Sequence, residues 1–384
     1  MITKGNFAAL VFFTLVIALS VYVATRKKEC PKNTQAPEKQ LGDSGCVSPE
    51  PEKWALDTSK PIRPNTIFVS IPSYRDTECR DTVYDMFEAA SKPERIFAGV
   101  VQQNKLAKED CFDKCPDCKK RKDAGQIRVK NYDFKDAKGP CFARYQASKL
   151  WDGEAYYLQI DSHTKFVDGW DEMLLEEFKR TNDPKAIIAG YPPTEKQLDD
   201  IIRKGYKEFP MMCTTKMNKD GLPQVTANII KRTDEEAVPV AYAGAGLMCM
   251  PAEALKEVNY DPYLNFLFFG EELLHSARLW TSGYNFYSPV KPFAAHHYTR
   301  KGAPRFWDDN KEFEPCRQRA IKRVKYLLGL GKLEDVEEDF KVDIDNYGMG
   351  SARTLQEYWN FMGVDMTNPK QGTVSRCTPD GYRN

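Results

Sequence analysis

The sequence has no excess of charge of either sign, and this absence bears on its partners. Its 384 residues include 56 lysines and arginines and 55 aspartates and glutamates, which leaves a formal net charge of +1. A protein without a broad positive field has little means of attracting a polyphosphate backbone. We therefore expect no nucleic-acid partner.

Long hydrophobic runs are also scarce. A mean hydropathy of −0.59 excludes a protein with several membrane spans. One run stands apart, because residues 6–25 carry no charge, and at about 1.5 Å per residue they would cross a hydrocarbon layer about 30 Å thick. The run ends at the basic residues 26–28, so we predict an uncleaved anchor over 1–28. A cleaved secretory signal, with 18–20 as its cleavage site, is the alternative.

The segment that follows the predicted anchor offers little to pack. Residues 29–64 are rich in Pro, Lys, Glu, Gly and Ser, which predicts a flexible stem. One basic side chain, Lys4, precedes the apolar run, and four follow it between positions 26 and 32. This count favours a cytosolic location for the bulk of the chain, although long domains often cross a membrane regardless of it.

Cysteine, in contrast, is abundant. Eleven cysteines are many for a cytosolic enzyme, and the odd number leaves at least one thiol unpaired within a single chain. Cys111, Cys115, Cys118 and Cys141 would suffice for a zinc site, but their spacing is not a tight zinc signature. Loop disulfides are an equal alternative, and we assign no catalytic role to a cysteine.

From residue 65 onward the pattern indicates an α/β domain. A β-branched run over 66–71, apolar residues at helical spacing over 83–90 and a second apolar run over 95–102 form a βαβ opening, for which the sheet should be parallel. We predict a catalytic domain over 65–310 and a helical extension over 311–384 that packs on it. Further predicted strands are 126–130, 156–160, 186–189 and 240–250, and predicted helices are 142–151, 170–180, 271–281 and 315–328.

A polar cluster follows the predicted strand 156–160. Ligands of open α/β sheets bind at the carboxyl ends of strands. In an extended chain Asp161 and His163 share one face while Ser162 points away. A carboxylate and an imidazole on one face form half of a site for a divalent ion. Alone, this motif is common, and a polar strand end would explain it equally well.

The scarcity of histidine strengthens the metal hypothesis. The sequence has only four histidines, and three of them are His163 and the adjacent pair His296 and His297. On an extended segment only one member of that pair can face a metal, and the sequence barely separates them. His275 is most simply a helix-surface or packing residue.

Three further features of the sequence each allow two interpretations, one functional and one structural. Glu271 and Glu272 end an apolar run, where they either complement the dipole of a helix or face a pocket. Arg144 opens a predicted helix, where it either clamps a phosphate or forms a surface salt bridge. Gly246 either allows close approach of a ligand or marks tight packing.

At these residues the chain resembles a known family, the hydroxyproline-linked polypeptide α-N-acetylglucosaminyltransferases. The resemblance covers about 66–305 and continues toward 365, and it depends on an ordered series of motifs rather than on any one of them. The motifs are Ser70-Ile-Pro-Ser-Tyr-Arg-Asp76, Gly139-Pro-Cys-Phe-Ala-Arg144, Leu158-Gln-Ile-Asp-Ser-His163, Tyr260-Asp-Pro262, Phe269-Gly-Glu-Glu272, Arg278-Leu-Trp-Thr-Ser-Gly-Tyr284, His296-His-Tyr-Thr-Arg300 and Phe306-Trp307.

The resemblance implies a GT-A fold with a mixed, mainly parallel sheet, and transfer of N-acetylglucosamine from a UDP-sugar, with retention, to a hydroxyl of a protein or glycan. It implies that Asp161, His163 and His296 hold Mn²⁺ or Mg²⁺, with His297 as the substitute. Glu271 is the first choice for the acid nearest the sugar, and Glu272 the second. The implied donor-binding residues are Ser70, Pro72, Ser73, Tyr74, Arg75, Asp76, Arg144, Asp161 and Gly246.

The expected chemistry agrees with this assignment. Cleavage of a glycosyl–phosphate bond places charge on the departing diphosphate, which a divalent ion and Arg144 would neutralise. The sugar becomes oxocarbenium-like, and an acceptor that attacks on the face left by the diphosphate needs no protein nucleophile. We therefore name none.

The predicted anchor separates this chain from the best-known family members, which act in the cytosol. It predicts a single-pass type II protein of the ER or Golgi, while a catalytic domain that faces the cytosol stays open. Two other functions remain: a membrane-tethered binding module for nucleotide sugars or glycans, and a metallophosphoesterase. The second requires Gly-Asn-His-Asp and Gly-His-X-His motifs, which are absent from the sequence.

Overall fold

The computed structural model describes residues 46, 56–113, 115–299, 301–368 and 371–383. The predicted anchor within 1–28 and the greater part of the predicted stem lie outside these residues. Within the described ranges, no helix has the length and apolar character needed to cross a membrane. The chain divides into two units, Met1–Gly45 and Cys46–Asn384, and the fold is that of the second.

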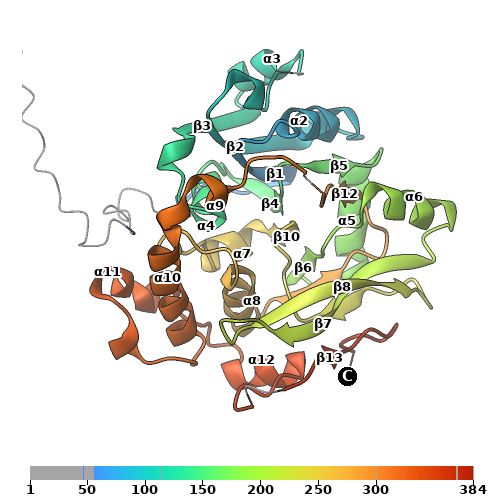
Figure 1. Cartoon of the computed structure of the whole chain (residues 1–384). Helices are drawn as coiled ribbons and strands as arrows, with labels where there is room; N and C mark the ends of the chain where they lie inside the picture. The colour runs from blue at the N-terminus through green and yellow to red at the C-terminus, as the bar shows by residue number, and fades with distance from the viewer. Residues whose placement is uncertain (1–45, 47–55, 114, 300, 369–370, 384) are drawn as a thin grey trace, which may run out of the picture. The chain divides into compact units, whose positions relative to one another are not determined.

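An eight-stranded mixed sheet forms the centre of this unit (Figure 1). Strands β1, β2, β3 and β4 run parallel, β10 runs antiparallel to β4 and β6, and β11 runs parallel to β6. The sheet confirms the predicted α/β class. Its order is β3 (Ile127–Asp133), β2 (Ile96–Asn104), β1 (Arg63–Tyr74), β4 (Glu154–Ile160), β10 (Leu247–Pro251), β6 (Ala186–Ala189), β11 (Asn285–Ser288) and β9 (Val238–Val240).

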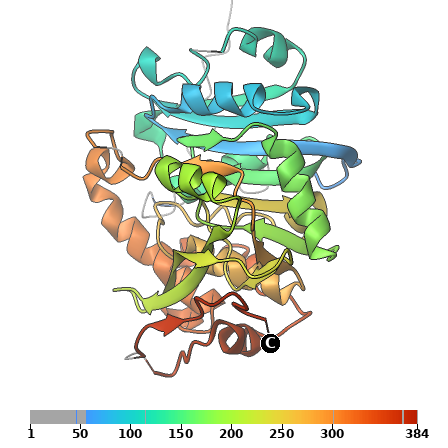
Figure 2. The same ribbon diagram turned by 90° about the vertical axis from the view of Figure 1, so that its right-hand side faces the viewer.

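Both faces of the sheet are covered, as a mostly parallel sheet requires. Side chains alternate along β1, so that Ile67, Val69 and Ile71 join one apolar cluster while Phe68 joins the other. Figure 2 shows the blue and teal segments at the top of the unit and the red C-terminal segment at the bottom. The α-helices are α2 (Cys79–Glu88), α3 (Cys118–Asp123), α4 (Pro140–Ser148), α5 (Trp170–Thr181), α6 (Glu195–Arg203), α7 (Ala252–Glu257), α8 (Glu271–Thr281), α9 (Phe306–Asp309), α10 (Glu314–Leu327), α11 (Glu338–Lys341) and α12 (Leu355–Met362).

One predicted strand is wrong. Residues 240–250 form two strands, β9 and β10, joined by a buried loop rather than one continuous strand. The loop approaches the chain after β6 so closely that a Cβ on Gly244 would lie 2.9 Å from the carbonyl oxygen of Gly190. The apolar character of this stretch reflects burial and not extended conformation.

Two small sheets lie beside the large one. Strand β7 (Glu208–Met217) pairs with β8 (Pro223–Lys231) on one side and with β13 (Val374–Ser375) on the other. The other sheet pairs β5 (Thr164–Phe166) with β12 (Ala294–His296) in antiparallel register, which sets His296 opposite Thr164. That register brings His296 next to the end of β4, although the two are far apart in sequence.

The C-terminal residues pack on the rest of the unit. Helix α12 begins with a capping box between Thr354 and Glu357. The hydroxyl of Tyr358 donates to the carbonyl oxygen of Ala241 at 2.9 Å, and its ring lies 5.5 Å from that of Trp280, centroid to centroid. These contacts anchor α12 to α8 and to the loop before β10.

Within the described part of the chain, eight of the ten cysteines are paired. The disulfides are Cys46–Cys316, Cys79–Cys111, Cys115–Cys118 and Cys213–Cys377. The zinc hypothesis is wrong, because Cys111, Cys115 and Cys118 are oxidised, and Cys141 is a buried thiol that donates to the carbonyl oxygen of Leu267. Of the two alternatives, loop disulfides are confirmed.

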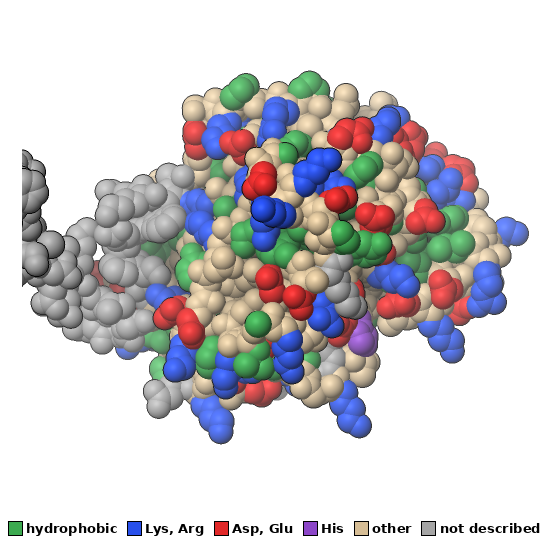
Figure 3. Space-filling model, turned by 90° about the horizontal axis from the view of Figure 1, so that it is seen from above, with side chains coloured by type: hydrophobic (Ala, Val, Ile, Leu, Met, Phe, Trp, Pro, Cys, Tyr) green, Lys and Arg blue, Asp and Glu red, His purple; other side chains and the backbone are tan. Residues whose placement is uncertain are grey.

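The near-zero net charge is also visible on the surface. On the face seen in Figure 3, acidic and basic side chains are interspersed rather than gathered by sign.

Candidate functional site

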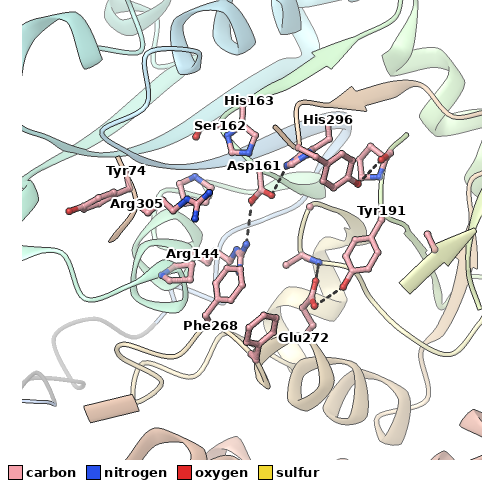
Figure 4. Close-up of a pocket in the computed structure, with 18 of the residues that line it drawn as sticks. Tyr74, Arg144, Asp161, Ser162, His163, Tyr191, Phe268, Glu272, His296 and Arg305 are labelled. Carbon is pink, nitrogen blue, oxygen red and sulfur yellow. Dashed lines mark hydrogen bonds and ion pairs between the residues drawn. The ribbon is translucent and has the colours of Figure 1, made fainter. Parts of the chain in front are cut away.

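A cavity of about 970 Å³ lies at the carboxyl ends of β1 and β4 (Figure 4). This is where ligands bind in open α/β sheets. Of the residues that the sequence singled out, seven of the donor-binding and metal candidates line it, together with one of the two acids. They are Pro72, Tyr74, Arg144, Asp161, His163, Gly246, His296 and Glu272.

Three potential metal ligands converge in this cavity. One ligand atom each from Asp161, His163 and His296 lie within 4.8 Å of one another. Nε2 of His296 is 3.1 Å from Oδ2 of Asp161, and the centroids of the two imidazole rings are 4.5 Å apart. Asp161 and His163 meet through a turn between β4 and β5, not through the extended chain that we expected.

The other member of the histidine pair points elsewhere. His297 lies outside the cavity lining, its side chain is 48% exposed, and its Nδ1 is 2.7 Å from Oε2 of Glu78. His296 is the last residue of β12, and its pairing with β5 turns it toward Asp161. The structure therefore brings together Asp161 and His296, and not His297.

Asp76 lies behind the metal candidates rather than in the cavity lining. Its Oδ2 accepts a hydrogen bond from Oγ of Ser162 at 2.6 Å and lies 2.9 Å from Nδ1 of His163. This contact fixes the imidazole ring and leaves Nε2 of His163 for a ligand role. Asp76 is therefore placed to position His163.

Arg144 is buried, which excludes the surface salt bridge considered for it. Its guanidinium pairs with Glu271, and its Nη2 lies 3.3 Å from Oδ1 of Asp161. Burial alone would raise the pKa of the Asp161 carboxyl, but the hydrogen bond with His296 and the charge of Arg144 hold that pKa well below its usual range. A permanently negative carboxylate is thus maintained at the candidate metal site.

The two acids at the start of α8 have different positions. Oε1 of Glu272 accepts from the backbone N–H of Ala245 at 2.7 Å, and its Oε2 accepts from the hydroxyl of Tyr191 at 2.7 Å, at the cavity wall. Burial raises the pKa of Glu272 above its usual value. Glu271 is behind Arg144 and outside the cavity lining. The structure thus places Glu272, and not Glu271, at the cavity.

Part of the predicted uridine segment is turned away from the cavity. Ser70 and Ser73 are fully buried. Arg75 lies outside the lining as well, with its Nη1 2.5 Å from Oδ2 of Asp309. The hydroxyl of Tyr74 donates to the same carboxylate oxygen at 2.8 Å, so Asp309 links this segment to α9.

Aromatic residues lie at the rim of the cavity, and no sequence pattern gave them a role, although Phe269 and Trp307 stand in the motifs that carry the family resemblance. Phe268 and Phe269 are 42% and 40% exposed. The ring of Phe268 lies 4.8 Å from that of Phe269 and 5.2 Å from that of Trp307, centroid to centroid. The apolar run before Glu271 resembled a buried segment, and nothing in its composition signalled exposure. Tyr191, Arg305 and residues 224–229 of β8 also line the cavity without having been predicted.

The fold is shared with glycosyltransferases. The chain is similar in structure to GalNAc-T7 in its crystal structure with UDP, GalNAc and Mn²⁺, with a TM-score of 0.51 and 14% identity. The match covers 76% of this chain and 56% of that one, so the chain spans little more than half the length of this relative. A mannosyltransferase from Pyrobaculum calidifontis, in complex with GDP-Man and Mn²⁺, aligns with a TM-score of 0.41 and 12% identity over 77% of this chain and 73% of that one.

The sequence itself identifies the family. The model of the glycosyltransferase family described as "Glycosyltransferase (GlcNAc)" matches residues 66–122 and 113–368, which together span most of the chain. The chain belongs to this family. No curated protein matches the sequence significantly.

Proposed function

We propose that the protein is a metal-dependent, retaining enzyme that transfers N-acetylglucosamine from a UDP-sugar to a hydroxyl of a protein or glycan. One observation carries this proposal: Asp161, His163 and His296 converge beside the buried cation of Arg144 in a cavity large enough for a nucleotide sugar. The GlcNAc family model supports the choice of sugar.

The residues present fit a divalent ion. One carboxylate and two imidazoles are a donor set that suits Mn²⁺ better than Mg²⁺, which prefers oxygen ligands throughout. The GalNAc-T7 structure, which shares the fold, holds Mn²⁺ and UDP. When bound, the ion would supply positive charge to a departing diphosphate.

The remaining roles follow from position. Arg144 lines the cavity next to Asp161, so its charge is available to the diphosphate. Pro72, Tyr74 and Gly246, which line the cavity, would contact the donor. Glu272 takes the role first given to Glu271, contact with the sugar or the acceptor hydroxyl.

Four disulfides support a location for the catalytic unit in the lumen of the ER or Golgi. Disulfides form and persist in oxidising compartments and are rare in the cytosol. Eight paired cysteines within the described chain are typical of a luminal domain. With an anchor over 1–28, this gives the type II topology that we propose.

A donor screen tests the function. The purified full-length chain is incubated with Mn²⁺ and, in turn, with UDP-N-acetylglucosamine, UDP-N-acetylgalactosamine and UDP-galactose, without acceptor. We expect slow UDP release, fastest with UDP-N-acetylglucosamine, and its abolition by EDTA.

Other outcomes identify the alternatives. Tight binding of a donor without release of UDP would indicate a binding module, and release of phosphate from simple esters would indicate a phosphoesterase. Retention is tested by the anomeric configuration of the transferred sugar, read from NMR coupling constants; a β-linked product would contradict it.

A further inference from the structure

Strand β8 presents its backbone edge to the cavity. In its sheet, within the described residues, β8 pairs with β7 alone, so its second side is an edge. Six consecutive residues, 224–229, line the cavity. Because successive side chains of a strand point to opposite faces, a consecutive series means that the cavity reaches the edge of β8. Pro210 of β7, which pairs with Ile229, also lines the cavity, so at that end the cavity extends over one face of the sheet as well.

This edge differs from the other edges of the two larger sheets. Exposed strand edges are normally short, charged or interrupted by proline, because a free edge invites pairing with another chain. Strand β3 carries Arg128, Lys130 and Asp133, β9 contains Pro239, and β13 has two residues. Strand β8 has Pro223 and Lys231 at its two ends, but residues 224–230 between them carry neither charge nor proline. The long neutral edge faces the reaction cavity.

The edge is also held in place. Its partner β7 is fixed from the other side by β13 and by the disulfide Cys213–Cys377. The amide of Asn228 in β8 donates to Oγ1 of Thr214 in β7 at 3.0 Å. A fixed edge loses little conformational entropy when a ligand pairs with it, which favours binding.

We propose that a polypeptide acceptor, the class that the family resemblance implies, binds in extended conformation as an additional strand on the β8 edge. This inference rests on the proposed function and concerns how the acceptor binds. A free strand edge offers alternating N–H and C=O groups, which another extended backbone complements and a sugar chain does not. The exposed rings of Phe268 and Phe269 line the same cavity and provide apolar contacts for acceptor side chains.

Backbone methylation tests the pairing directly. The full-length chain with Mn²⁺ and UDP-N-acetylglucosamine is given a library of peptides of about twelve residues, each with a central Ser, Thr or hydroxyproline. The best substrate is resynthesised with one N-methyl group at each position in turn. We expect transfer to fall by about tenfold at every second residue, because alternate N–H groups face the partner strand. Loss at no position, or at all positions equally, would overturn the pairing.

A matched pair of variants locates the site. Ile229 on β8 and Ile202 on α6 are 38% and 39% exposed, but only Ile229 lines the cavity. Ile229→Lys places a charge on the edge and should lower peptide transfer about tenfold relative to UDP release. Ile202→Lys should leave the ratio of transfer to release unchanged. Equal ratios in the two variants would overturn the assignment of β8.

Two further measurements distinguish a peptide acceptor from other ligands that could occupy the β8 edge. Transfer to free oligosaccharides but to no peptide, with normal UDP release, would overturn the inference and leave the transferase function intact. A dimer in analytical ultracentrifugation that Ile229→Lys dissociates would assign the edge to a second copy of the chain. No UDP release by the wild-type protein would overturn the function itself, and the inference with it.

Discussion

The two ends of the cavity are built differently. At the metal end two of the three candidate ligands are held by a further charged group: Asp76 contacts His163, and Arg144, which pairs with Glu271, contacts Asp161. At the β8 end the lining strand carries no charge over 223–230, and several of its side chains are exposed.

The two ends of the cavity suit two different kinds of ligand. In the proposed function, the diphosphate and the metal ion would be the same in every catalytic cycle, and buried, mutually fixed charges would bind them in one geometry, at a cost in desolvation that their pairing offsets. A polypeptide acceptor would vary in its side chains but not in its backbone, and a neutral strand edge would tolerate that variation. The metal end is therefore expected to be sensitive to single substitutions and the β8 end tolerant of them.

The largest effect is expected at Asp161. Asp161→Asn keeps the size of the side chain but removes the anionic ligand, and UDP release at saturating Mn²⁺ should fall about a thousandfold. Calorimetric titration should show weaker Mn²⁺ binding. Lys231→Ala, an exposed change on β8 outside the cavity lining, is the control. Wild-type release by Asp161→Asn would remove this residue from the metal site and break the contrast between the two ends.

The next effect concerns stability at the metal end. Glu271→Gln leaves the buried guanidinium of Arg144 without its main partner, and the free energy of unfolding should fall by about 3 kcal/mol. Glu272→Gln is the matched control; it keeps a hydrogen-bonding group beside Tyr191 and should cost about 1 kcal/mol. Both are measured by urea unfolding. Equal losses would show that Arg144 does not depend on Glu271.

His275 should make the packing beneath the metal end sensitive to acid. Burial lowers the pKa of this imidazole to about 3, and the ring stacks on Tyr260. The unfolded chain, with a histidine pKa of about 6.5, binds the proton more readily, so stability is complete above that pH and falls by up to about 1.4 kcal/mol per unit below it. His275→Phe should flatten this slope between about pH 6 and pH 4 in urea titrations. An unchanged slope would assign the acid sensitivity to other groups.

The smallest effect is expected at the aromatic rim. Phe268→Ala removes the ring that contacts Phe269 and Trp307 and should raise KM for a peptide acceptor about fivefold, with a smaller change in UDP release. Leu333→Ala, with a side chain of similar exposure outside the cavity lining, is the control. If the KM values of the two variants agree, the rim does not contact the acceptor.

Local patterns in the sequence predicted much of this molecule. Strand β6 and helix α8 have the predicted bounds, because the first is a short apolar run and the second a helical pattern that begins after Gly270. The Asp161-Ser-His163 cluster and the scarcity of histidine pointed to Asp161, His163 and the pair His296 and His297, and three of these four residues converge at the metal end.

The features that could not be predicted from the sequence depend on contacts between distant parts of the chain. The choice of His296 over His297 follows from the register of β12 on β5. The choice of Glu272 over Glu271 depends on which face of α8 turns toward β10 and which toward Arg144. Strands β7 and β8 were not predicted, and β7 is held by a disulfide to Cys377, far along the chain. None of these long-range contacts produces a recognisable pattern in the sequence around the residues concerned.

The disulfide between Cys46 and Cys316 has a mechanical consequence. It joins a residue near the start of the catalytic unit to α10, and the carbonyl oxygen of Cys46 also accepts a hydrogen bond from the Asn265 amide at 3.2 Å. If the proposed anchor over 1–28 holds the chain to a membrane, tension ahead of Cys46 would pass through this covalent bond into α10 rather than through β1. The strand that leads into the cavity would then be isolated from that load.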